Sequence, residues 1–451
     1  MRKEEKKIDM TQGALLPQIL VFAFPLILSG MLQLLFNAAD IIVVGKFAGS
    51  NALGAVGANS SLINFFVNIF IGLSIGANVT AAKYLGAKKP VEVSDTVHTS
   101  VVLAFITGVA IMVAGILLAR PILTFMETPD EILDLAVLYL RIYFCGMPVM
   151  VLYNFGASLL RAVGDTKRPL VYLLIAGVIN VILNLIFVIQ FHMSVAGVAL
   201  ATIISQCAST VMVIRCLVLE RGSMRLFMLK EKLKVSPERL KEIIAVGLPA
   251  GVQGVLFSIS NILIQSSVNS FGAIAVAGNT AASNIEGFIY VAMNASYQAC
   301  VSFTGQNFGA RKFDRILKVL LLCVLTGALT GIIMGMPAYF ILGTKLLSLY
   351  SSDAQVIAYG MKRLSIIAPT YALCVIMEVP VGTMRGMGRG VLPVIVSLIG
   401  ACGFRILWIM TVFKMYPTLE TLYISYPVSW ILTALAQFIL AFFTYRRLKD
   451  I

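Results

Sequence analysis

Long apolar runs dominate the pattern of hydrophobic and polar positions from Leu16 to the C-terminus. Crossing a hydrocarbon core of about 30 Å takes roughly 20 helical residues, and the runs are long enough to do so. They predict twelve membrane-spanning helices, near residues 16–45, 53–80, 95–118, 131–155, 169–190, 195–219, 243–268, 273–303, 316–340, 356–382, 391–413 and 420–443. The predicted fold is therefore an all-α polytopic membrane protein.

The composition excludes a water-soluble protein. Of 451 residues, 59% are hydrophobic and 12% are charged, whereas about a quarter of the residues in a soluble globular domain are charged. A soluble domain cannot bury that much apolar surface.

The net charge of +14 comes from basic residues that follow the predicted membrane boundaries. Most of the 35 Lys and Arg residues lie at the termini and in alternate loops, whereas the opposite loops hold Lys46, Arg120, Lys345 and Lys414. Because cytoplasmic loops are enriched in Lys and Arg, both termini are predicted to be cytoplasmic, with the chain in the cytoplasmic (inner) membrane. This distribution indicates membrane lipids as partners of the basic segments, and no nucleic acid.

The predicted spans divide the chain into five segments. These are a cytoplasmic N-terminal tail (1–15), an N-terminal six-helix lobe (16–219), a basic cytoplasmic linker (220–242), a C-terminal six-helix lobe (243–443) and a cytoplasmic C-terminal tail (444–451). The opening MRKEEKKIDMTQ is charged and lacks the short apolar region of a signal peptide, so we expect it to be retained.

The two lobes repeat one another about 224 residues apart. FPLILSGMLQLLFNAAD from Phe24 aligns with LPAGVQGVLFSISNILI from Leu248, LGAKKP (85–90) with FGARKF (308–313), and RAVGDTKRP (161–169) with RGMGRGVLP (385–393). Three matches in the same order at a nearly constant offset indicate a duplication. Each copy has an even number of spans, so the two six-helix bundles are predicted to be pseudo-symmetric about an axis along the membrane normal.

Several of these segments together resemble the multidrug and toxic compound extrusion (MATE) family over essentially the whole chain. They are NAADIIVVGKFAG, GANVTAAKYLGAKKP, VSFTGQNFGARKFDR, LLRAVGDTKRP and IMEVPVGTMRGMGRGVLP. The resemblance implies a secondary antiporter, not an enzyme, that exports amphipathic organic cations or other xenobiotics in exchange for protons or Na⁺. It implies a monomer without cofactors other than the coupling ion, and it is closest to the DinF-like branch, whose ion site lies in the N-terminal lobe.

Three carboxylates, Asp40, Glu286 and Glu378, lie well inside predicted spans. A charge at bilayer depth costs about 2.5–3.5 kcal/mol on insertion scales, so each is a functional candidate. The seven cysteines form no CxxC pair, and His98 and His192 sit at span ends, so no metal site is expected other than Na⁺ at Asp40.

Asp40 is the strongest candidate for ion coupling. Counting about 1.5 Å per residue from the outer span ends places Asp40, Asn184 and Thr202 at one depth, with Asn180 one turn deeper. Such oxygen-bearing side chains suit a proton site or a small hard cation. Two structural alternatives stay open: the amides hold helices together, or Asp40 caps an outer helix end.

The polar cluster is not duplicated. The positions in the second repeat that are equivalent to Asp40, Asn180 and Asn184 hold Ile264, Phe404 and Trp408, which favours coupling through the N-terminal lobe. The second carboxylate that the resemblance implies in the fifth span is replaced by Asn184. Because Na⁺ prefers several oxygens and local negative charge, a single ionisable group favours the proton as coupling ion.

Further polar residues are predicted to line the substrate cavity. They are Gln33, Asn37, Asn154, Glu286, Glu378 and Arg405. Gln33 and Asn37 share a helical stripe with Asp40, and Glu378 and Arg405 form either an intramembrane ion pair or a second ion or substrate site.

Pro25 and Pro249 occupy equivalent places in the first and seventh spans. A proline inside a helix removes a hydrogen bond and kinks the helix. A kinked first span that carries Asp40 would couple ion binding to helix shape.

Other functions fit the sequence less well. A lipid or oligosaccharide flippase of the wider superfamily is the main alternative, but such proteins usually carry extra spans and several cationic residues in the cavity. A membrane enzyme would need a nucleophile with a base or a metal cluster, and the sequence offers neither.

Overall fold

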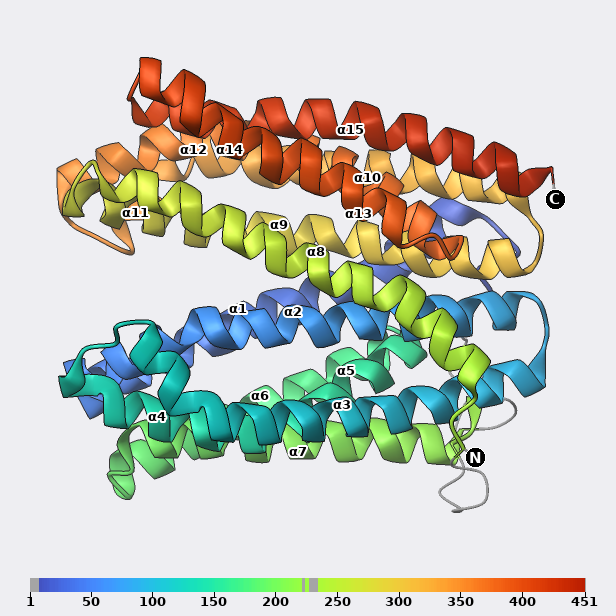
Figure 1. Ribbon diagram of the computed structural model, residues 1–451, viewed down its shortest axis with the longest axis horizontal. Coiled ribbons are helices and arrows are strands. Elements are labelled where there is room, and N and C mark those ends of the chain that lie inside the picture. Colours follow the sequence, from blue (N-terminus) through green and yellow to red (C-terminus); the bar gives the residue numbers. More distant parts are fainter. Residues whose placement is uncertain (1–7, 221–223, 227–233, 451) are drawn as a thin grey trace. The chain divides into compact units, whose positions relative to one another are not determined.

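The computed structural model describes residues 8–220, 224–226 and 234–450, which fold into long helices (Figure 1). The α-helices are α1 (Leu15–Val43), α2 (Ser50–Gly86), α3 (Pro90–Phe125), α4 (Asp130–Cys145), α5 (Met147–Ala162), α6 (Lys167–Leu185), α7 (Ser194–Leu219), α8 (Pro237–Asn269), α9 (Ala273–Gly309), α10 (Phe313–Phe340), α11 (Gly343–Ser348), α12 (Ala354–Gly386), α13 (Val391–Ser397), α14 (Phe404–Trp408) and α15 (Leu419–Lys449). Parts of the predicted N-terminal tail and of the predicted basic linker lie outside the described residues.

Ten helical segments in the described part of the chain are long and apolar enough to cross a membrane, and the bent pair α4–α5 makes eleven if it forms one span. The predicted eighth span, α9, is not among them, and its interior carries Asn279, Glu286 and Asn294. These polar side chains lower the hydropathy of a helix that is nevertheless 37 residues long.

The backbone repeats at the offset found in the sequence. α2 and α9 both contain 37 residues and begin 273 − 50 = 223 positions apart. Each follows a glycine in the left-handed region that favours glycine, with φ of 89° at Gly49 and 90° at Gly272. Lys88 and Arg311, also 223 positions apart, share a φ of 54°. The duplicated sequence therefore folds in the same way twice.

The fourth predicted span differs in shape from the expected straight helix at 131–155. The chain forms two helices, α4 and α5, that meet at Gly146 with a bend of 47°. Pro148 in the first turn of α5 has no N–H to donate and its ring disfavours a continuous helix. The equivalent interval in the second repeat is the single helix α12.

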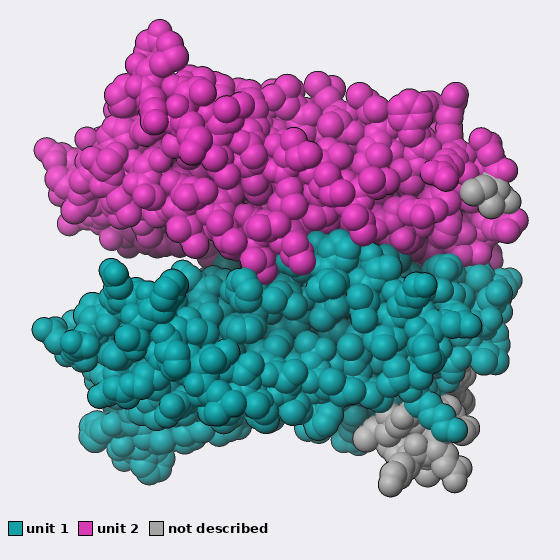
Figure 2. All heavy atoms as spheres, viewed as in Figure 1, with its two compact units in different colours: residues 1–7, 28–251 teal, residues 8–27, 252–451 magenta. Residues whose placement is uncertain are grey.

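Contacts divide the described chain into two units, coloured separately in Figure 2. Unit 1 contains residues 28–251, and unit 2 contains residues 8–27 and 252–450. α1 therefore begins in unit 2 and continues in unit 1, whereas α8 begins in unit 1 and continues in unit 2. Both divisions fall two residues after a helix-internal proline (27 − 25 = 2 and 251 − 249 = 2). Pro25 and Pro249 thus lie where these helices leave one unit for the other.

Within unit 1, glycines bring α2 and the first half of α8 into backbone contact. A Cβ at Gly72 would collide with the Gly251 nitrogen, and a Cβ at Gly76 would collide with the Ile243 carbonyl oxygen. Gly247 approaches the α2 backbone in the same way. Small residues spaced by four allow such close packing of membrane helices.

Candidate ion-coupling site

Three helices of unit 1, α1, α6 and α7, carry the predicted ion-coupling residues. Asp40 lies near the end of α1, which continues into a π-helical turn at Val44–Ala48. Asn184 lies near the end of α6, which continues into a second π-helical turn at Ile186–Gln190. Such turns are rare and often mark functional sites, because they alter the direction of neighbouring side chains.

The predicted residues form one hydrogen-bonded cluster. The Asn184 amide nitrogen donates to Asp40 Oδ1 and, over 3.2 Å, to Asn180 Oδ1. The Asn180 amide nitrogen lies 3.4 Å from Thr202 Oγ1, which donates to the Val198 carbonyl oxygen at 3.0 Å. The residues that the sequence placed at similar depths are therefore in contact in the structure.

Burial of the cluster leaves one acceptor unused. Asn184 is 1% exposed and Asn180 is 6% exposed. Asn184 Oδ1 is buried without a hydrogen-bond partner in the described structure, although a buried acceptor without a partner costs about 1–3 kcal/mol. A proton on the neighbouring Asp40 carboxyl or a small cation would supply the missing partner.

Packing beside the cluster holds α1 against α6. The Phe36 ring lies over Gly177, where a Cβ would overlap the ring. Phe36 is one turn before Asp40, and Gly177 precedes Asn180 on the same face of α6. The small residue therefore sets the distance between the two helices that carry the carboxylate and the amides.

Two tyrosines near Asp40 were not predicted from the sequence. Tyr139 and Tyr143 of α4 interact electrostatically with Asp40, and their rings stack with centroids 6.1 Å apart. Their spacing of four residues in an apolar helix is a signal that could have indicated a shared polar face.

The other predicted cavity residues of α1 and α5 do not join the cluster. Gln33 and Asn37 are exposed side chains of α1 and make no hydrogen bond with Asp40 or its partners. Asn154 is half-buried in α5, and its amide donates to the Met150 carbonyl oxygen at 2.9 Å.

The equivalent region of unit 2 is apolar, as the repeat predicts. Ile264 is 2% exposed in the hydrophobic core. Phe404 and Trp408 pack with ring centroids 5.7 Å apart, and the Trp408 indole donates to the Thr421 carbonyl oxygen at 2.9 Å.

Glu286 belongs to a buried ion pair that sequence reasoning missed. Arg363 Nε donates to Glu286 Oε1 at 2.9 Å, and Arg363 Nη2 donates to Oε2 at 2.7 Å. Arg363 Nη1 also donates to Asn279 Oδ1 at 2.8 Å, which accepts a further bond from the Tyr423 hydroxyl at 3.1 Å. Both carboxylate oxygens of the predicted substrate residue are therefore engaged by Arg363.

Of the two alternatives for Glu378 and Arg405, the ion pair between them is not formed in the described structure. Glu378 accepts a hydrogen bond from the Tyr290 hydroxyl at 3.3 Å. Arg405 Nε donates to Ser429 Oγ at 3.0 Å, and its guanidinium lies 4.2 Å from the Tyr426 ring centroid. The sequence does not show the directions in which these two side chains point.

A duplicated set of apolar helices, with one carboxylate in a buried polar cluster at bilayer depth, is typical of secondary membrane transporters. The MatE family profile matches residues 25–186 and 249–411. The chain therefore belongs to the MatE family of membrane transporters and is not an enzyme.

Relatives and solved structures resemble the chain over nearly its full length. A probable multidrug resistance protein, YoeA of Bacillus subtilis, is 27% identical over 92% of this chain and 91% of its own. The probable multidrug resistance protein NorM of Thermotoga maritima is 26% identical over 85% of this chain and 82% of its own. The FAD transporter of Shewanella oneidensis is 23% identical over 76% of this chain and 75% of its own.

A solved structure described as a multidrug resistance MATE family transporter in the outward-facing conformation aligns with a TM-score of 0.90. It is 23% identical and covers 99% of this chain and 100% of its own. The predicted all-α fold of two six-helix bundles is confirmed, because MATE transporters share a twelve-helix fold with two lobes.

Proposed function

We propose that the chain is an antiporter that exports amphipathic organic cations in exchange for protons, with Asp40 as the proton carrier and Asn180, Asn184 and Thr202 as its partners. Membership in a transporter family and the names of the multidrug resistance relatives support export of such compounds. The basic termini and loops support cytoplasmic ends and the cytoplasmic (inner) membrane.

The observation that carries the proposal is the contact between Asp40 and Asn184 beside an unused acceptor. A protonated Asp40 can donate to Asn184 Oδ1, whereas an ionised Asp40 can accept from the Asn184 amide, as it does here. Each protonation state thus has its own hydrogen-bond pattern between α1 and α6. The location of the cluster in unit 1 alone also supports the DinF-like branch.

Transport by the purified protein in proteoliposomes tests the proposal. A fluorescent organic cation should move against its gradient when a proton gradient is imposed, and a Na⁺ gradient at fixed pH should have no such effect. Efflux driven by Na⁺ and indifferent to the proton gradient would contradict proton coupling, and transport without any ion gradient would contradict antiport.

Asn184→Asp should change the ion that drives transport. The substitution puts a second carboxylate next to Asp40, and two carboxylates provide the negative charge and oxygen ligands that Na⁺ prefers. We expect efflux by the variant to acquire a dependence on Na⁺ that the original chain lacks, measured as initial rate against Na⁺ concentration at fixed pH.

Asn154→Asp is the matched control, because Asn154 lies in unit 1 but outside the cluster. Its rate should not respond to Na⁺. An equal response in both variants, or none in Asn184→Asp, would contradict the role of Asn184.

A further inference from the structure

A cavity of about 550 Å³ in unit 2 is surrounded by basic side chains. Its walls come from the segment before α1, the turn between α9 and α10, and the end of α15. The basic residues that line it are Arg311, Lys312, Arg315 and Lys449, and the carboxylate among its lining residues is Asp314. Four basic side chains thus face one carboxylate, and the positive-inside pattern predicts that this end of the unit is cytoplasmic.

Lys312 and Arg315 donate hydrogen bonds to backbone carbonyl oxygens of the segment before α1. Arg315 Nη1 donates to the Gly13 carbonyl oxygen at 3.0 Å, and Arg315 Nη2 donates to the Gln12 carbonyl oxygen at 3.2 Å. Lys312 Nζ donates to the Thr11 carbonyl oxygen at 2.8 Å. These acceptors are uncharged, so both side chains keep the wall formed by residues 10–13 in place and leave their positive charge in the cavity.

Arg311 is the cationic group that remains available. It is exposed, and its side chain makes no ion pair or hydrogen bond with the described residues. Lys449, at the end of α15, pairs with Asp314 at 3.2 Å. The first turn of α10 also lines the cavity, and its backbone N–H groups add partial positive charge at a helix N-terminus.

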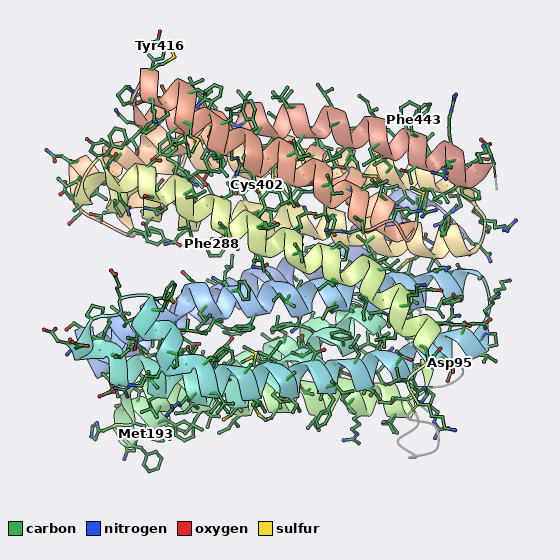
Figure 3. All side chains as sticks on the ribbon, viewed as in Figure 1. Asp95, Met193, Phe288, Cys402, Tyr416 and Phe443 are labelled. Carbon is green, nitrogen blue, oxygen red and sulfur yellow. The ribbon has the colours of Figure 1, made fainter. Side chains whose placement is uncertain are left out.

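Apolar side chains of α10 follow the cavity along the helix. Phe313 packs against Tyr445 of α15 with ring centroids 6.2 Å apart. Leu317 and Leu321, one and two turns into α10 on the face that carries Asp314, are 45% and 56% exposed. Phe443 of α15 is 63% exposed, on the opposite face of its helix from Tyr445. Figure 3 shows the Phe443 side chain projecting outward from α15. Positive charge at the end of apolar membrane helices matches the headgroup and acyl chains of a phospholipid.

The same turn in the first repeat lacks this arrangement. Lys88 and Lys89 stand at the positions equivalent to Arg311 and Lys312. The position equivalent to Arg315 is Glu92, which pairs with Lys89 at 3.6 Å. The excess of positive charge is therefore a property of the second turn alone and not of the repeated fold.

We propose that this cavity binds the headgroup of an anionic phospholipid of the cytoplasmic leaflet. Arg311, Lys449 and the start of α10 contact the phosphate, and the exposed apolar side chains of α10 contact the acyl chains.

Native mass spectrometry of the full-length protein in detergent tests the proposal, with phosphatidylglycerol and phosphatidylcholine of identical acyl chains as probes. We expect tighter binding of phosphatidylglycerol, and a loss of about fivefold for each charge removed in the double variant Arg311→Gln/Lys449→Gln. The control variant Lys88→Gln/Lys89→Gln should bind phosphatidylglycerol as the original chain does, and thermal unfolding checks that both variants are folded.

Three outcomes would overturn the proposal. The first is equal binding of the two lipids, and the second is an equal loss in the control variant. The third is complete displacement of the lipid by excess inorganic phosphate, because a site for a free anion would not need acyl chains.

Discussion

Asp40→Asn is expected to reduce gradient-driven efflux to the background of protein-free liposomes while the protein remains folded in the membrane. Asn has nearly the shape of Asp and can still accept from the Asn184 amide, so the contact between α1 and α6 is preserved. The substitution removes the one carboxylate of the cluster, and with it the ability to take up and release a proton. The measurement is the initial rate of cation efflux in proteoliposomes under an imposed proton gradient.

Asp134→Asn is the matched control for this experiment. Asp134 lies on α4 of the same unit, and its side chain is 82% exposed and pairs with Arg120 at 3.1 Å. An exposed pair of this kind contributes at most about 1 kcal/mol. The control should retain both stability and efflux. Wild-type efflux by Asp40→Asn would refute the assignment of the carrier.

Arg363→Met is expected to lower the free energy of unfolding by about 3–5 kcal/mol, because it leaves the Glu286 carboxylate buried without a counter-charge. Glu286 is 2% exposed and receives two hydrogen bonds from Arg363, so no other group in the described structure replaces them. Reversible unfolding of the purified protein by denaturant in detergent measures the loss.

The neighbouring residue Lys362 provides the control. Lys362 pairs with Glu420 at 2.9 Å, but both side chains are more than 40% exposed, so Lys362→Met should cost no more than about 1 kcal/mol. The double variant Glu286→Leu/Arg363→Met should recover part of the stability lost in Arg363→Met, since no unpaired charge remains. Equal losses in Arg363→Met and Lys362→Met would show that the buried ion pair contributes no more to the free energy of unfolding than the exposed pair does.

Features that depend on the position of a residue along a helix axis could be predicted from the sequence. Hydrophobic runs predicted the helices, the repeat predicted the duplicated backbone, and residue counting placed Asp40, Asn184 and Thr202 at one depth, where they belong to one hydrogen-bonded cluster. These features depend on the constant rise of a helix from one residue to the next and need no knowledge of tertiary packing.

Features that depend on rotation about a helix axis were not predictable in the same way. Glu378 and Arg405 were candidates for an ion pair, but they contact different neighbours. Arg363 was overlooked as the partner of Glu286, because the pairing depends on how α9 and α12 are rotated against one another. The distribution of α1 and α8 between two units could not be predicted from the sequence either, because it depends on long-range packing rather than on the local sequence pattern.

The first part of α1 belongs to unit 2 and the first part of α8 belongs to unit 1. This division determines the order in which the two units can be completed during synthesis. Unit 1 has all its described residues once the chain has been made as far as Gly251. Unit 2 cannot be completed then, because residues 8–27 emerge from the ribosome first and pack with residues made last. Ile19 and Phe22 are both 0% exposed in the finished protein. They therefore cannot reach that burial until residues 252–450 have been made. For the same reason, a chain divided in the linker would yield two fragments, each lacking a segment that its unit requires.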